Sequence, residues 1–127
     1  MNWMKRTVWI SCLVVAVAAA GSTTTDGSQR STPEIMQQKL IKSQQLLRAL
    51  ILADFDTIKE LSDELDSLSE YQSWFVLPTP EYAQYTREFR QEAQAMALAG
   101  ANRDLGTAYG AYTSMLGTCL QCHNYMR

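Results

Sequence analysis

Residues 105–123 read LGTAYGAYTSMLGTCLQCH, and this stretch determines both the class of fold and the expected chemistry. Its apolar residues recur at the three- and four-residue spacing of one helical face. It ends on C-x-x-C-H, Cys119 to His123, the sequence form of covalent haem attachment. On a helix Cys119 and His123 share one face, and Cys122 flanks that face. One helical turn can therefore offer two thiols to the vinyl groups of a haem and an imidazole to its iron.

Other sites that use paired cysteines fit the sequence less well. A structural zinc site normally needs four Cys or His ligands. This chain has one His, and its third thiol, Cys12, lies in a segment expected to be removed. A thioredoxin-like redox pair belongs after a strand in a βαβ pattern, and no strand pattern occurs here. We therefore expect one covalently attached haem c, with its iron, as the cofactor.

The N-terminal segment has the pattern of an export signal. Lys5 and Arg6 precede an apolar stretch, residues 8–20, that ends on the small-residue pattern of Ala18 and Ala20. Its length of 13 residues falls short of the roughly 20 that span a bilayer. We expect a signal peptide over residues 1–20, cleaved after Ala20, with an uncleaved membrane tether as the alternative. Export predicts a periplasmic protein, which agrees with haem attachment outside the cytoplasmic membrane.

The rest of the chain is expected to form one acidic domain. Residues 21–31 are almost without apolar side chains and predict a disordered leader, so the folded domain is expected to cover residues 32–127. Removing Lys5 and Arg6 takes the formal net charge from −2 to about −4. A nucleic-acid partner would need a basic patch, so we expect none.

Four amphipathic stretches fill the domain, and no alternating strand pattern occurs. Thr32 and Thr79 are each followed by Pro and Glu, which is typical of a helix start. The first helix is expected over residues 33–53, and the second begins at a cap, Asp54 or Asp56, and reaches Leu68. The third is expected over residues 80–99 and ends at Gly100. The fourth runs from a cap at Asn102 to the C-terminus. Short loops between such helices predict an all-α fold, an antiparallel four-helix bundle with covalently attached haem.

The last helix carries three interior glycines, Gly106, Gly110 and Gly117. Each costs roughly 1 kcal/mol relative to Ala in a helix interior. Two interpretations stay open: close approach of the haem or a neighbouring helix, and simple tolerance in a well-packed helix.

A haem motif at the extreme C-terminus of an exported four-helix bundle resembles the class II c-type cytochromes, the cytochrome c′ and cytochrome c-556 group. The likeness spans residues 33–127 and rests on Cys119, Cys122, His123 and the basic Arg127. It implies that the two cysteines form thioethers and that His123 is the proximal iron ligand. Arg127, one turn later, would then limit the basicity of the imidazole or bind a haem propionate. A solvated terminal charge is the alternative for Arg127.

The resemblance also implies that a residue of the first helix faces the other side of the haem. A Met sulfur there gives a six-coordinate electron carrier, whereas a bulky apolar residue leaves a five-coordinate iron that binds NO or CO. Met36 is the candidate ligand, and Leu40 on the same apolar stripe, which also includes Leu47 and Leu50, is the alternative distal group. A Met on such a stripe also serves as plain core filling. Met96, Met115 and Met126 are weaker candidates for the iron ligand. Lys39 is also a weak candidate, because its amine would have to lose a proton before it could bind iron.

One departure from the resembled pattern concerns the haem propionates. That group often has an Arg one helical turn before the distal residue. One turn before Met36 stands Thr32, and one turn before Leu40 stands Met36, so neither candidate is preceded by a basic residue. The remaining candidates for propionate contacts are Lys39, Arg87 and Arg90.

Two apolar pairs complete the candidate contacts. Trp74 and Phe89 are the expected neighbours of the haem edge, although ordinary core packing accounts equally well for Phe89. Ile41 and Ile51 would support a homodimer through the first two helices, a pairing known in the resembled group, or else belong to the core.

Together these patterns predict an exported monohaem electron-transfer cytochrome rather than an enzyme. It would cycle Fe(III)/Fe(II) with a redox partner protein docking near the haem edge. The alternative is a five-coordinate cytochrome c′ that sequesters or senses NO or CO. A peroxidase is disfavoured because the chain has no second His to act as a distal general base.

Overall fold

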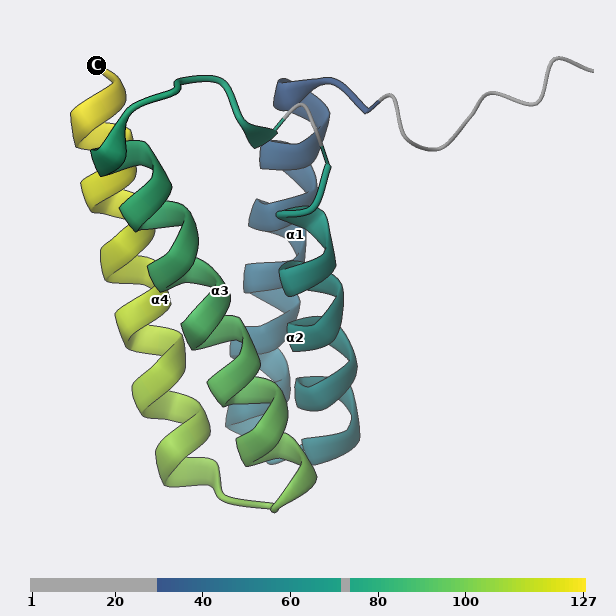
Figure 1. The fold of residues 1–127 in the computed structure, drawn as a ribbon. Helices are drawn as coiled ribbons and strands as arrows, with labels where there is room; N and C mark the ends of the chain where they lie inside the picture. The colour runs from purple at the N-terminus through teal and green to yellow at the C-terminus, as the bar shows by residue number, and fades with distance from the viewer. Residues whose placement is uncertain (1–29, 72–73) are drawn as a thin grey trace, which may run out of the picture.

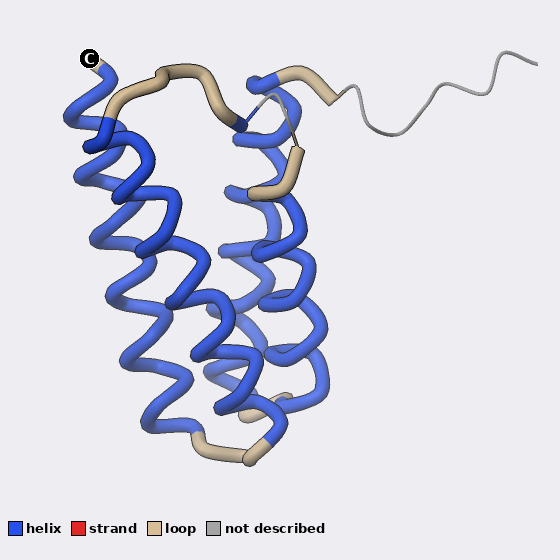
Figure 2. The backbone as a smooth tube through the Cα atoms, in the orientation of Figure 1, coloured by secondary structure: helices blue, strands red, loops and turns tan. Residues whose placement is uncertain are grey.

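The computed structural model of the chain describes residues 30–71 and 74–127. This part contains four helices and no strand: α1, Thr32–Leu52; α2, Phe55–Leu68; α3, Pro80–Ala101; and α4, Leu105–Met126 (Figures 1 and 2). The all-α prediction with four helices is confirmed. The expected signal peptide, residues 1–20, and the leader from 21 to 29 lie outside the described residues.

Two of the predicted helix starts are confirmed. Asp54 precedes α2 and accepts a hydrogen bond from the backbone N–H of Thr57 at 3.2 Å. Thr79 precedes α3 and accepts from the N–H of Tyr82 at 3.3 Å. Each side chain satisfies one of the backbone donors that a helix leaves unpaired in its first turn.

The other two starts differ from the prediction. Ser31, rather than Thr32, is the N-cap of α1, and its backbone N–H donates to the carboxylate of Glu34 at 2.8 Å. Asp104, rather than Asn102, caps α4 and accepts from the N–H of a residue in the first turn, Thr107, at 3.0 Å. In both places two adjacent or near-adjacent residues have capping side chains, so the spacing alone does not choose between them.

The leader prediction is wrong for its last two residues. Ser31 belongs to the cap of α1, and Arg30 donates a hydrogen bond to the Gln38 side chain at 2.8 Å. The Arg30 guanidinium also lies over the ring of Tyr71, 5.1 Å from its centroid. These contacts hold the entry to α1 against the bundle.

The buried face of α1 differs from the predicted stripe. Its buried residues are Ile35, Leu46, Ala49 and Leu50, whereas Leu40 and Leu47 are 54% and 49% exposed. Apolar residues occur almost all round this helix, so several stripes fit a helical period equally well. The buried stripe passes through Lys39, a residue type that hydrophobic patterning assigns to solvent. The core alternative for Ile41 and Ile51 is also wrong, because these side chains are 43% and 78% exposed.

The prediction that Gly100 ends α3 is wrong, and Gly100 instead allows α3 to approach α2 closely. The helix continues to Ala101, and a Cβ atom built on Gly100 would lie 2.9 Å from the backbone nitrogen of Lys59 and 3.0 Å from the carbonyl oxygen of Phe55. Built Cβ atoms at Gly110 and Gly117 meet nothing within 4 Å. Within the described residues, close helix approach therefore belongs to Gly100 and not to those glycines of α4.

The Gly100→Ala substitution is expected to destabilise the fold by about 1–3 kcal/mol, because its methyl group would overlap α2 backbone that cannot easily move. The matched Gly110→Ala substitution should instead stabilise it by up to about 1 kcal/mol through helix propensity alone. Urea unfolding of both variants in the same cofactor state measures the two effects. Equal effects of the same sign would contradict the contact assigned to Gly100.

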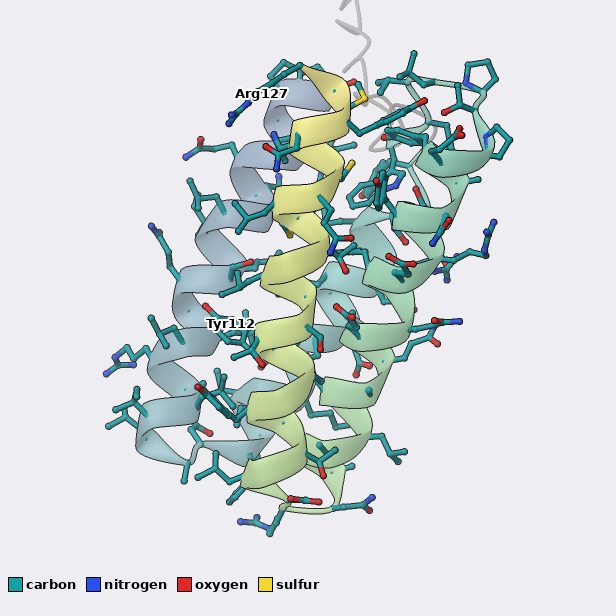
Figure 3. All side chains as sticks on the ribbon, turned by 90° about the vertical axis from the view of Figure 1, so that its left-hand side faces the viewer. Tyr112 and Arg127 are labelled. Carbon is teal, nitrogen blue, oxygen red and sulfur yellow. The ribbon has the colours of Figure 1, made fainter. Side chains whose placement is uncertain are left out.

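Helix α3 packs extensively against both α4 and α2, and α1 packs mainly against α2, and this arrangement positions the site. Figure 1 shows α1 beside α2 and α3 beside α4, with both connecting turns at the same end. Helices α1 and α4 make few direct contacts. One of them joins the Tyr112 hydroxyl, which donates to the carbonyl oxygen of Ser43 at 3.0 Å (Figure 3). Nearer the C-terminal end of α4, both helices instead line a cavity and a groove. No helix in the described residues is both long and apolar enough to cross a bilayer.

Candidate functional site

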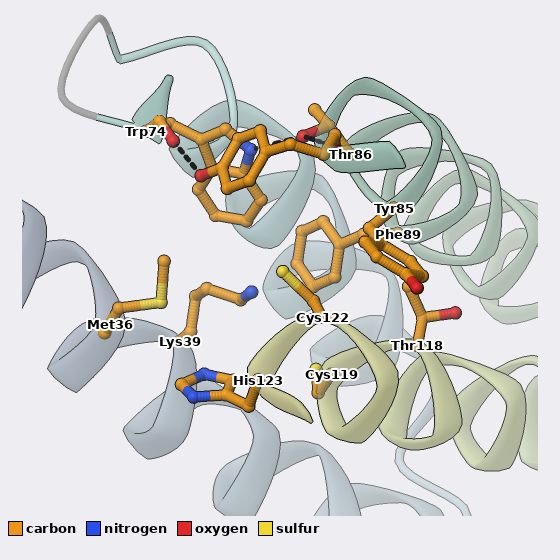
Figure 4. Close-up of a pocket in the computed structure, with 11 residues that line it drawn as sticks. Met36, Lys39, Trp74, Tyr85, Thr86, Phe89, Thr118, Cys119, Cys122 and His123 are labelled. Atoms are coloured by element: carbon orange, nitrogen blue, oxygen red, sulfur yellow. Dashed lines mark hydrogen bonds between the residues drawn. The ribbon is translucent and has the colours of Figure 1, made fainter. Parts of the chain in front are cut away.

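The three residues of the C-x-x-C-H motif border one cavity. Figure 4 shows Cys119, Cys122 and His123 on the last turns of α4, beside side chains of α1 and α3 and that of Trp74. The cavity is narrow, with a volume of about 20 Å³, which is room for about one water molecule. A groove of about 400 Å³ between α1 and α4 shares Met36, Lys39, Cys119 and His123 with it. Only the groove has a volume in the range of small-molecule and cofactor sites.

The helical geometry of α4 sets the environment of each motif residue. Cys119 and Cys122 are free thiols and half-buried, whereas His123 is exposed. Burial raises the pKa of both thiols, and the ammonium group of Lys39 acts in the opposite direction on both. The predicted placement of all three residues around one helical turn agrees with this structure.

A hydrogen-bonded aromatic wall faces the thiols. Trp74 and Phe89 are buried, with their ring centroids 5.1 Å apart. The indole N–H of Trp74 donates to the hydroxyl of Thr86 at 3.0 Å, and the Tyr82 hydroxyl donates to the Trp74 carbonyl oxygen. The structure therefore brings Trp74 and Phe89 to the cavity and fixes the orientation of the indole, and their contact with a haem edge stays a prediction.

The two distal candidates of α1 lie at different places. Met36 is half-buried and lines both the cavity and the groove. Leu40 lines only the groove and is mostly exposed. Of the weaker candidates, Met96 and Met115 are fully buried in the core, and Met126 is exposed at the end of α4. Met36 is therefore the methionine that the fold brings to the cavity.

Lys39, a propionate candidate and unlikely iron ligand in the sequence, contacts two aromatic rings of the site. It lines both the cavity and the groove, and its Nζ atom lies 4.2 Å from the Trp74 ring centroid and 4.1 Å from that of Phe89. Burial lowers its pKa. The sequence signal that could have found it is its register, four residues after Ile35 and seven before Leu46 on the buried line of α1.

The arginine candidates lie elsewhere. Arg127 follows the end of α4 and is exposed (Figure 3), and Arg87 is exposed on α3. Arg90 donates to Asp66 at 2.8 Å and to Glu70 at 3.3 Å, so it is already paired with α2 and the residues after it. Of the three propionate candidates, the structure brings only Lys39 to the cavity.

No group of three or more His, Cys, Asp or Glu residues is arranged to hold a bare metal ion within residues 30–71 and 74–127. Comparison with protein families, curated proteins and solved structures finds no match for this chain.

Proposed function

We propose that this chain is an exported, periplasmic monohaem c-type cytochrome of the class II type that transfers electrons by Fe(III)/Fe(II) cycling. One observation carries the proposal: the two thiols and the imidazole of a single C-x-x-C-H turn border the same aromatic-walled cavity. The donor set fits a haem chemically. Sulfur nucleophiles suit vinyl carbons, an imidazole suits iron, and apolar rings suit a porphyrin face.

Cys119 and Cys122 would hold the group covalently. Each thiol would add across one vinyl double bond, forming a carbon–sulfur bond and leaving the thiol hydrogen on the neighbouring carbon, so that no outside oxidant is needed. Both cysteines lie on the cavity side of α4 and are free. Two bonds from one helical turn would fix the orientation of the haem edge against the helix.

His123 and Met36 would bind the iron. His123 follows Cys122 directly and borders both the cavity and the groove. Met36 approaches from α1, and its soft thioether would stabilise the ferrous state. A bound haem would supply the one-electron chemistry, and the wall of buried Trp74 and Phe89 would keep water away from it.

The alternative function is that of a five-coordinate cytochrome c′ that binds NO or CO. The groove between α1 and α4 favours it, because this opening leads to Met36 and His123 and would admit a small gas. The chain would then sequester or sense the gas instead of passing electrons to a redox partner protein. Occupation of the sixth position by Met36 separates the two functions.

The full chain, produced in bacteria that can attach haem, tests the proposal. We expect a coloured protein whose mass exceeds that of the mature polypeptide by one haem. Its ferric spectrum should be low-spin with a sulfur-to-iron charge-transfer band, and the reduced protein should not bind CO. A high-spin spectrum with CO binding would favour the gas-binding alternative. A colourless product of bare-polypeptide mass would refute both.

A further inference from the structure

Lys39 places a positive charge inside the candidate site without a negative partner. Its ammonium lies over the rings of Trp74 and Phe89 and has no hydrogen bond or ion pair with the described residues. The other lysines of the folded part are paired, Lys42 with Glu64 and Lys59 with Asp63. Ring faces stabilise a cation but do not neutralise it. The charge of Lys39 therefore acts on whatever shares the cavity.

One acidic side chain is indirectly connected to the cavity. Glu92 on α3 is half-buried and accepts a hydrogen bond from the Thr118 hydroxyl at 3.5 Å, and Thr118 lines the cavity. Burial raises the pKa of Glu92. Glu92 does not line the cavity and its hydrogen bond is with Thr118, so it does not neutralise the charge of Lys39 by a direct contact.

We propose that Lys39 raises the reduction potential of the group held by Cys119, Cys122 and His123. This inference rests on the proposed function. Reduction adds one electron from the redox partner to the iron and lowers its positive charge by one unit. A fixed cation nearby repels the iron less in that state, so it favours Fe(II). Partial burial strengthens the effect, because charges interact more strongly away from water.

The test compares reduction potentials of haem-loaded variants by optical redox titration. Lys39→Gln removes the charge while keeping an unbranched side chain in the cavity, and it adds no thioether that could bind iron. We expect its ratio of reduced to oxidised protein, at a fixed solution potential, to fall on the order of tenfold, from Coulomb's law at an effective dielectric constant of about 20. Lys39→Arg keeps the charge and should stay close to the unmodified protein. Lys59→Met removes an exposed, paired charge on α2 and should change nothing.

The outcomes separate this inference from the proposed function. A colourless unmodified chain would refute the proposed function itself. A haem-loaded Lys39→Gln protein with an unchanged potential would overturn the role of Lys39 alone. A shift of equal size in Lys59→Met would do the same. So would a change of spin state in Lys39→Gln, because it would mean that the amine of Lys39 binds iron directly. Loss of an unpaired partly buried charge should not prevent folding, and Lys39→Leu provides a second neutral variant.

Discussion

Replacing Cys119 and Cys122 together with Ala is expected to abolish covalent haem attachment. The two half-buried thiols are the free sulfur nucleophiles that border the cavity, and no other cysteine lies in the described residues. Without them, the imidazole of His123 could hold a haem only by coordination, a bond that denaturation breaks. Haem staining after denaturing electrophoresis and the mass of the intact protein measure the loss.

The chain offers a matched control for this experiment. Cys12 lies in the expected signal peptide, so Cys12→Ala should leave the haem content of the mature protein unchanged. Each single variant, Cys119→Ala or Cys122→Ala, should keep at most one thioether and bind haem in lower yield. Full covalent haem in the double variant would contradict the assignment of the C-x-x-C-H turn.

Failure to recover coloured protein could also come from a variant that does not fold. Circular dichroism of the purified double variant distinguishes the cases, because the four helices should survive removal of two half-buried sulfurs. Each substitution removes one sulfur atom from a site that already borders a cavity, so the cost in stability is expected to lie at the low end of core truncations.

The fold could be predicted because its signals are local. Amphipathic periodicity gave four helices, and the side chains of Asp54 and Thr79 marked two of their starts. The position of the motif on α4 follows from the same helical period. The register of α1 could not be predicted in this way, because apolar residues on several of its faces leave the buried one undetermined.

The roles that escaped prediction depend on contacts between distant segments. Gly100 resembles a helix stop in sequence, but its role comes from the backbone of α2 at Lys59 and Phe55. In sequence Lys39 resembles a solvent-facing lysine. In the fold its ammonium lies over the rings of Trp74, before α3, and Phe89, on α3. Such roles arise from packing between elements, which a hydrophobic pattern within one helix does not contain.

The Met36→Ala substitution is expected to convert the proposed cytochrome from a low-spin to a high-spin protein. Met36 is the methionine that lines the cavity, whereas Met96 and Met115 are enclosed in the core. Loss of its thioether would open the sixth position of the iron, so the reduced variant should bind CO or NO. The reduction potential should fall as well, because thioether ligation stabilises ferrous haem. Optical spectra of the ferric protein and of the reduced protein with CO measure the change.

Leu40→Ala provides the comparison on the same helix. Leu40 lies at the groove and is mostly exposed, so its removal should leave the spin state as it is and, at most, ease the entry of a gas. If Leu40→Ala changed the coordination and Met36→Ala did not, the residue of α1 that faces the iron would lie one turn further along. If the unmodified protein were already high-spin, Met36 would be core filling and the groove would serve as the entry for the gas. The pair of variants therefore decides between an electron carrier and a gas-binding protein.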